Sequence, residues 1–429
     1  APQPNMIDIL NKFFFRPKDI KSANSSFQTL KEETNILKIF NSIEEFSEKS
    51  EIRYVGGCVR KIINNEKVDD IDLAVNLIPD EVSDILKKNK IKFFKTGIDH
   101  GTITALIDEK KFEITSLRKD ILTDGRHAKV EFSNNWLKDA SRRDFTINSI
   151  YADINGNFFD PFNGKTDLKN GNVKFIGDPN KRLKEDYLRI LRYIRFYLNY
   201  GKTGHDEQTK KALRQNISGV SLISNERLLS ELKKLLISQN FVKIENDNFI
   251  KEILILIFPQ LINLDNIKNL NEFSKNNFHK KNFVFLISFL IIDSSDNSDY
   301  FLYKYNLSND EKRKINFLKD IFSKKIEKNF FSEKNLWKIF YKNNKDYLID
   351  LIDFQIFKTK KVDKKLLELK NFFLDKPKPI FPIKARDLID NYNYKEGIEL
   401  GAKLKELEKF WLNNDFKISK EEIKEIVKS

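Results

Sequence analysis

The sequence predicts an α+β protein, in which a mixed segment of strands and helices is followed by a segment that is almost entirely helical. Between about residues 52 and 176, short alternating runs such as GTITALI and KFEITSL are separated by turn pairs such as Asn163-Gly164. This alternation is typical of half-buried strands. From about Lys181 onward glycine becomes rare and apolar residues recur three and four apart, as in RLLSELKKLLI. That spacing indicates amphipathic helices, and a chain of 429 residues is expected to divide into two to four compact units.

The spacing of apolar residues changes from the strand pattern to the helix pattern near Gly177, where we expect the first domain boundary. Pro179 is expected to begin a helix, with Asp178 as its N-cap. Two later breaks divide the helical part: the polar run DSSDNSD at 293–299 and the proline-rich run LDKPKPIFPIK, which no helix can cross. The pattern therefore predicts two helical blocks and a tail.

Composition restricts the class of protein. The longest apolar run, FVFLISFLII, is about half as long as a membrane-spanning helix, so no membrane association is expected. The single cysteine, Cys58, excludes an intramolecular disulfide and a cysteine-rich zinc site. The sequence does not open with the charged and then apolar segments of a signal peptide. We therefore expect a cytoplasmic protein. The net charge of +14 favours a polyanionic partner, nucleic acid first. Lysines that only cover solvated helix faces are the alternative.

Two aspartates stand two residues apart in the apolar run DDIDLAVN. In a strand, side chains two apart share a face, so Asp70 and Asp72 are expected to point together, and Ile71, Leu73 and Val75 to the buried side. Paired carboxylates repel each other unless a cation lies between them, and such oxygen ligands suit Mg²⁺. A solvated strand end is the alternative for this pair alone.

A glycine pair precedes the aspartates by about a dozen residues. Gly56 and Gly57 end the predicted strand RYVGG and open a helix, so that bare N–H groups can approach a phosphate; Arg60 lies one turn further on. Together with the aspartates, the turn predicts a triphosphate site beside a metal pair, which performs phosphoryl or nucleotidyl transfer. Glu113, in KFEITSL, is the candidate third catalytic acid, and an ordinary exposed strand residue is the alternative reading.

The order of these motifs resembles that of the class II tRNA nucleotidyltransferases, the CCA-adding enzymes, which share their catalytic head with bacterial poly(A) polymerases. The resemblance runs through GGCVRK, DDIDLAVN, GIDHGTITALI, FEITSLRKDILTDGRHA, ASRRDFTINSI, FDPFNGKTDL and KEDYLRILRYIRF, and more weakly through NERLLSELKKLL and LKELEKFWLNNDFKISKEE. It implies a nucleotidyltransferase head with a mixed β-sheet at 30–177, then an all-α neck at 178–240 for base recognition, a body at 241–320 and a tRNA-binding tail at 321–429. The implied reaction is template-independent addition of CCA to the 3′ end of tRNA from CTP and ATP, by a two-metal mechanism.

The resemblance also assigns roles by position. Asp70 and Asp72 correspond to the ligands of Mg²⁺, and Gly57 and Arg60 to triphosphate contacts. A second set, placed around the sugar and phosphates, comprises Arg142, Arg143, Asp144 and Asn148. The chain departs from the family at Lys61, where aspartate is usual, and this departure concerns the packing of the local helix.

The motif EDYLRILRYIRF, taken as one helix, places a row of charged residues three apart along one side: Asp186, Arg189, Arg192 and Arg195. Cytosine and adenine both present a donor amine beside an acceptor ring nitrogen. A carboxylate only accepts and a guanidinium only donates, so Asp186 and Arg189 together fit these two bases and reject uracil and guanine. A salt-bridged, exposed helix is the alternative.

The segment 118–139 is expected to be a long mobile loop, which in the family serves the change from C to A addition. Contacts to tRNA are expected to follow its backbone and shape, with candidates at Lys280, Lys281, Lys324 and Lys325. The rival functions are a poly(A) polymerase or A-adding enzyme, and a non-catalytic RNA-binding protein. The sequence leaves the oligomeric state open.

Overall fold

The computed structural model describes residues 17–97, 100–123 and 128–429. The chain forms two compact units, the first of residues 1–241 with 252–257 and the second of 242–251 with 258–429. All the strands among the described residues belong to the first unit. The expected division after residue 240 lies beside this boundary, and the four-part division of the chain stays a prediction.

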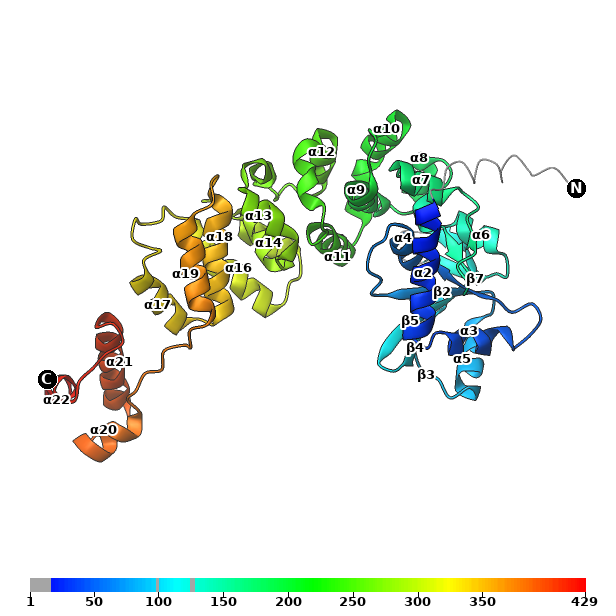
Figure 1. Cartoon of the computed structure of the whole chain (residues 1–429). Helices are drawn as coiled ribbons and strands as arrows, with labels where there is room; N and C mark the ends of the chain where they lie inside the picture. Colours follow the sequence, from blue (N-terminus) through cyan, green and yellow to red (C-terminus); the bar gives the residue numbers. More distant parts are fainter. Residues whose placement is uncertain (1–16, 98–99, 124–127) are drawn as a thin grey trace, which may run out of the picture. The chain divides into compact units, whose positions relative to one another are not determined.

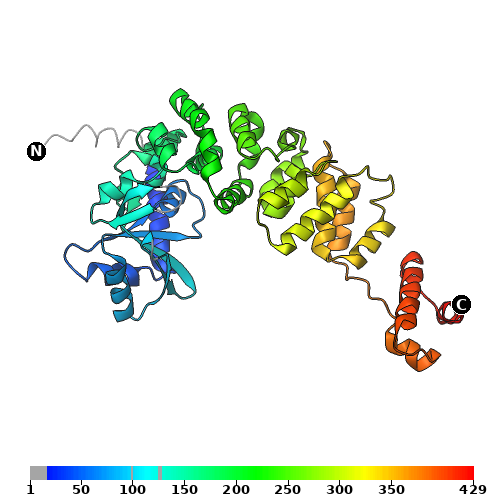
Figure 2. The same cartoon turned by 180° about the vertical axis from the view of Figure 1, so that it is seen from behind.

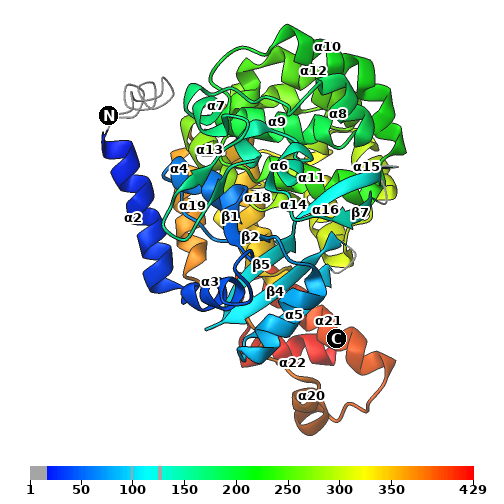
Figure 3. The same ribbon diagram turned by 90° about the vertical axis from the view of Figure 1, so that its right-hand side faces the viewer.

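The first unit is built on a mixed seven-stranded sheet in the order β3-β4-β5-β2-β1-β8-β9. Its strands are β1 (Ile52–Val55), β2 (Ile71–Val75), β3 (Lys92–Gly97), β4 (Thr102–Ile107), β5 (Lys110–Ser116), β8 (Tyr151–Ala152) and β9 (Phe158–Phe159). Only the pair β2 and β5 is parallel among the described pairs of this sheet. Figure 3 shows β1, β2, β5 and β4 side by side. The mixed β-sheet that the family resemblance implies is confirmed.

One face of the sheet is buried under helices α2 (Pro17–Glu33), α3 (Leu37–Glu44), α4 (Gly57–Ile63) and α5 (Pro79–Lys88). Ile71, Leu73 and Val75 of β2 point into this core, as their alternation predicts. The core also takes Ile39, Phe40 and Ile43 from α3, Val59 and Ile62 from α4, and Val82, Ile85 and Leu86 from α5. Each such side chain contributes about 1.5–3 kcal/mol on burial, so this face is firmly fixed. Figure 1 shows α2 and α4 beside the sheet, and the two helices are in contact.

The segment 118–139 is not a long loop, which corrects the expectation. β6 (Arg118–Thr123) and β7 (Ala128–Phe132) pair antiparallel in a separate two-stranded sheet, and α6 (Trp136–Ser141) follows. The turn pair Asp124-Gly125 and the many charged residues give this segment a polar composition, so its sequence looks like a loop even though the two strands pair. Residues 124–127, between the two strands, lie outside the described residues.

The first unit continues in helices α7 (Gly164–Asn170), α8 (Pro179–Glu185), α9 (Arg189–Tyr200), α10 (Glu207–Asn216) and α11 (Asn225–Leu236), with the 3-10 helices η2 (Thr146–Asn148) and η3 (Ile217–Leu222). Asp178 caps α8 by accepting from the Asn180 N–H, with Pro179 at the first position, as predicted.

The motif EDYLRILRYIRF does not form one helix, which is a second correction. Asp186 has extended backbone angles, φ −156° and ψ 106°, between α8 and α9. Its carboxylate accepts from the Leu188 N–H at 3.1 Å. A short acidic side chain can compete for backbone N–H groups in this way, which ends one helix and starts the next.

The second unit is helical in its described elements. They are η5 (Leu264–Asn269), α13 (Glu272–Asn277), η6 (Phe278–Lys280), α14 (Phe283–Ile291), α15 (Asn297–Lys304), α16 (Asn309–Phe322), α17 (Glu333–Lys342), α18 (Lys345–Lys358), α19 (Lys364–Leu374), α20 (Ala385–Tyr392), α21 (Ile398–Asn413) and α22 (Lys420–Lys428). Residues from both units form η4 (Phe241–Asn246) and α12 (Asn248–Ile257). Figure 2 shows only helices in the part coloured from yellow to red.

The apolar run at α14 is a core helix, because all of its residues are buried. Among the described residues, none of the helices has the length and apolar character needed to span a bilayer. The proline-rich connector between α19 and α20 carries no helix, as its prolines predict.

Candidate active site

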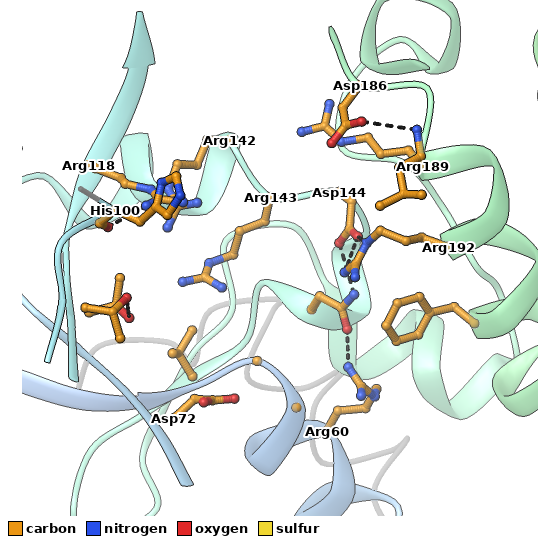
Figure 4. Close-up of a pocket in the computed structure, with 18 of the residues that line it drawn as sticks. Arg60, Asp72, His100, Arg118, Arg142, Arg143, Asp144, Asp186, Arg189 and Arg192 are labelled. Carbon is orange, nitrogen blue, oxygen red and sulfur yellow. Dashed lines mark hydrogen bonds and ion pairs between the residues drawn. The ribbon is translucent and has the colours of Figure 1, made fainter. Parts of the chain in front are cut away.

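A cavity of about 780 Å³ lies within the first unit. Its walls come from the turn between β1 and α4, from β2 and β5, from the segment after α6, and from α9. It brings together most of the residues that the sequence singled out: Gly56, Gly57, Arg60, Asp72, Arg142, Arg143, Asp144, Asn148, Asp186, Arg189, Arg192 and Arg195. Figure 4 shows Asp72, Arg143, Asp144 and Arg192 around this space. Asp70 and Glu113 do not line the cavity.

The glycine turn brings backbone close to the carboxylate. Gly56 has φ 66° and ψ −121°, a left-handed conformation that favours glycine, and α4 begins at the next residue. A Cβ atom on Gly57 would lie 3.9 Å from Asp72 Oδ2 and 3.7 Å from Arg60 Nη2. The start of α4 therefore faces the carboxylate with bare backbone.

Asp72 of β2 has two acidic neighbours, Glu113 and Asp70. In the parallel pair of β2 and β5, Asp72 lies opposite Glu113, and Asp70 is the residue before β2. Burial, followed by the charges of Glu113 and Asp70, raises the pKa of Asp72 to about 6, against the opposing charges of Arg143 and Arg60. No hydrogen-bond donor among the described residues reaches the Asp72 carboxylate. The parallel register, which sequence cannot reveal, places the proposed third acid beside the aspartate pair.

The donor set fits a hard divalent cation. A half-buried carboxylate with two acidic neighbours and no hydrogen-bond donor is stabilised when a cation balances its charge. Within the described part of the chain, no three His, Cys, Asp or Glu side chains converge as metal ligands.

Asp139, which the sequence did not single out, orients two arginines of the cavity. Its Oδ1 accepts from Arg142 Nε at 3.0 Å and its Oδ2 from Arg143 Nη2 at 3.2 Å, and the Tyr151 hydroxyl donates to it at 2.5 Å. Burial alone would raise the pKa of this carboxyl, but the charges of Arg143 and Arg142 lower it to about 2. Its position three and four residues before the arginines is the signal that could have identified it.

A second chain of contacts links Asp144 and Asn148 to α9. Asp144 accepts from Arg192 Nε at 2.6 Å and from Asn148 Nδ2 at 3.0 Å, and Asn148 accepts from Arg60 (Figure 4). Burial would raise the pKa of Asp144, but the Arg192 charge and the Asn148 hydrogen bond lower it to about 2. The Arg60 guanidinium also lies 4.8 Å from the centre of the Phe196 ring. These residues therefore hold one another in place as well as lining the cavity.

Asp186 and Arg189 do not pair with each other. Asp186 Oδ2 lies 2.7 Å from Arg227 Nη2, and Arg189 Nη1 lies 2.6 Å from Glu185 Oε2 and 2.8 Å from the Arg182 carbonyl oxygen. Each proposed base-reading group therefore has its own supporting partner.

Sequence reasoning missed these partners, because helical spacing does not indicate which side chain lies across the fold. Arg227 comes from α11, far from Asp186 along the chain. The same helix supplies Glu231, whose Oε1 lies 2.6 Å from Arg195 Nε. The cavity is also lined by His100, Thr102, Thr115 and Arg118, none of which was expected there.

Comparison with known proteins gives the family of this chain. Residues 52–174 match the family described as the poly A polymerase head domain. The mitochondrial CCA tRNA nucleotidyltransferase 1 of Mus musculus is 34% identical over 397 residues, which cover 89% of this chain and 87% of the relative. The chain belongs to the CCA-adding tRNA nucleotidyltransferases. The CCA-adding enzyme of Staphylococcus haemolyticus is 32% identical over 73% of this chain and 76% of its own.

Solved structures of this family share the fold. The Bacillus stearothermophilus CCA-adding enzyme in complex with CTP has a TM-score of 0.68 at 20% identity and covers 94% of both chains. The Thermotoga maritima CCA-adding enzyme complexed with tRNA_CCA has a TM-score of 0.62 at 20% identity, over 94% of this chain and 98% of that one. The predicted fold class is confirmed. Nucleotidyltransferases of this family generally use divalent metal ions.

Proposed function

We propose that this chain adds CCA to the 3′ end of tRNA, from CTP and ATP, with no nucleic-acid template. Family membership gives the reaction class, tRNA nucleotidyl transfer. One observation supports the specific assignment. The Asp72 carboxylate of β2 lines the same cavity as a row of arginines, Asp186 and Arg189. Relatives of the same fold are described in complex with CTP, with ATP and with tRNA_CCA, which supports the same substrates here.

Asp70 and Asp72 are proposed to hold Mg²⁺, with Glu113 as the third acid. When bound, two divalent ions would hold the attacking and leaving oxygens in line and lower the pKa of the attacking hydroxyl. The raised pKa of Asp72 supports this role, because a carboxylate destabilised by its neighbours gains most from a cation. Arg142 and Arg143, together with the bare backbone at the start of α4, are proposed to bind the triphosphate.

Asp186 and Arg189 are proposed to read the edge of the incoming base. The partners of each group support this assignment, since Arg227 holds the Asp186 carboxylate in place and Glu185 holds the Arg189 donors in place. Uracil or guanine would leave an acceptor facing Asp186 and a donor facing Arg189. Unpaired polar groups of this kind cost about 1–3 kcal/mol each.

The tRNA is proposed to bind along the helical second unit, with the head at 30–177, the neck at 178–240, the body at 241–320 and the tail at 321–429. Lys280, Lys324 and Lys325 are exposed and stay candidates. Lys281 is a weaker candidate than the sequence indicated, because its ammonium pairs with the buried Asp353.

Location and the identity of the metal are also proposals. A cytoplasmic protein using Mg²⁺ is proposed from the composition and the carboxylate donors. The mouse and human relatives are named as mitochondrial, so location is to be tested by microscopy of the tagged protein in its own cell.

The decisive experiment incubates tRNA lacking its 3′ CCA with CTP and ATP, separately and together, in the presence of Mg²⁺. We expect C addition with CTP alone, and a CCA end that is then extended no further with both nucleotides. A long A tail would identify a poly(A) polymerase or A-adding activity instead. The absence of extension would leave a non-catalytic RNA-binding protein and overturn the proposal. The Asp72→Asn variant serves as the inactive control.

A further inference from the structure

A second cavity lies within the second unit, formed by residues that play no part in the site above. It has a volume of about 570 Å³ and is lined by Glu333, Lys334, Trp337, Pro379, Asp415 and Phe416. These come from α17, from the proline-rich connector and from the turn after α21. A space of this volume accommodates a nucleobase with its sugar.

The wall of this cavity contains a large ring, Trp337, which packs nearly parallel to Phe340 at a centroid distance of 6.0 Å. The half-buried Trp337 indole makes edge-to-face contacts with Phe372, Phe373 and Phe416, at centroid distances of 6.0, 5.0 and 6.2 Å. Such contacts fix the orientation of the indole. A ring that is already oriented loses little conformational freedom when a second flat ring stacks on it.

The turn after α21 is strained, and it places Phe416 in the cavity wall. Asp415 and Phe416 both have left-handed backbone angles, φ 51° and 62°. This conformation is unfavourable for a bulky residue and persists only where other contacts hold it. The Phe416 N–H donates to the Trp411 carbonyl at 2.9 Å, and its ring centre lies 4.9 Å from that of Trp411.

Three charged residues line the cavity, Glu333, Lys334 and Asp415, and Lys334 pairs with Asp415 at 3.2 Å. Further lysines lie next to lining residues along the sequence. Lys376 and Lys378 belong to the connector, and Lys417 follows Phe416. None of these three lysines has an acidic partner in the described part of the chain. The Glu333 carboxylate accepts only weakly, from the Trp337 indole at 3.4 Å, and so retains capacity to accept from the amine of a base. A flat ring, an acceptor at its edge and lysines on the same segments are features by which proteins bind unstacked RNA bases and their phosphates.

We propose that this cavity receives an unstacked base of the bound tRNA, stacked on Trp337, with the adjacent phosphates near Lys378 and Lys417. The proposal rests on the proposed function, because it takes tRNA as the partner. The base would enter the cavity between α17, the connector and the turn after α21.

Fluorine NMR of the full-length protein labelled with 5-fluorotryptophan tests the contact directly. The chain has three tryptophans, and the signal of Trp337 is identified by its loss in the Trp337→Phe variant. Adding tRNA that lacks CCA is expected to shift the Trp337 signal. If heparin, a polyanion without bases, reproduces the shift, or if tRNA leaves the signal unmoved, the base-binding proposal is overturned.

Affinity measurements with a matched pair of variants give the second test. Trp337→Leu removes the stacking surface and is expected to weaken tRNA binding about 5-fold to 100-fold, whereas Trp337→Phe retains a ring and is expected to stay within about 5-fold of wild type. The KM values for CTP and ATP should not change, because no residue lines both cavities. Normal CCA addition with unchanged tRNA affinity in Trp337→Leu would overturn the cavity proposal alone. A wild-type protein that adds no CCA would overturn the proposed function.

Discussion

Replacing Asp139 with asparagine is the sharpest test of how the active site is held together. The carboxylate is 1% exposed and balances Arg142 and Arg143, while an amide of the same shape carries no charge. Its pKa falls from 3.8 to about 2 in the folded protein. At about 1.4 kcal/mol per unit, this shift corresponds to roughly 2 kcal/mol of stabilisation by the ionised form.

The same interaction seen from the two arginines gives a similar loss, since breaking a fully buried ion pair costs about 3–5 kcal/mol and both guanidiniums are partly exposed. We therefore expect Asp139→Asn to lower the free energy of unfolding of the first unit by about 2–4 kcal/mol, or roughly 5–15 °C in melting temperature. Because the pKa of Asp139 is lowered on folding, its ionised form stabilises the protein above about pH 4, and this stabilisation is lost as pH falls through 2. The difference in unfolding free energy between variant and wild type should therefore have its full value at pH 7.

The functional consequence follows from the same contacts. With Arg142 and Arg143 free to change rotamer, the KM for both CTP and ATP should rise at least about tenfold, because positioned donors contribute to triphosphate binding. Differential scanning calorimetry and steady-state kinetics at pH 7 measure the two effects. Lys138→Ala, an exposed neighbour on the same helix, is the control and should change neither. An Asp139→Asn protein with wild-type melting temperature and KM would refute the reasoning.

Three further predictions concern separate parts of the chain. Asp72→Asn should reduce nucleotide incorporation at least about 10³-fold, because a neutral amide is a poor metal ligand, while filter binding shows unchanged tRNA affinity; appreciable turnover would contradict the metal role. Asp186→Ala should relax discrimination against UTP and GTP by about tenfold or more, measured as ratios of kcat/KM, and an unchanged ratio would remove its base-reading role. Burial, against the charges of Lys281 and Lys314, raises the pKa of Asp350 to about 6. The ionised Asp350 carboxylate therefore destabilises the fold fully above pH 6 and not at all below about pH 4. Asp350→Asn should raise the melting temperature at pH 7.5, and parallel thermal scans of both proteins should show no such gain near pH 4.

Local sequence was enough to find the elements that carry the chemistry. The alternation in DDIDLAVN predicts a strand with its aspartates opposite a buried face, and Ile71, Leu73 and Val75 are indeed buried. Pro179 after Asp178 predicts the start of α8. These features depend on residues one to four apart, whose geometry is set by the backbone repeat alone.

Tertiary structure decided which groups meet. Glu113 lies beside Asp72 only because β2 and β5 pair in one parallel register. Asp186 leaves the predicted helix because its side chain binds the Leu188 N–H, and it then meets Arg227 from a distant helix. The sequence by itself thus determined the strand, the glycine turn and the helical second half, since these follow from local spacing. The partners of Asp72, Asp139 and Asp186 depend on burial and on contacts between distant segments, which no local pattern encodes.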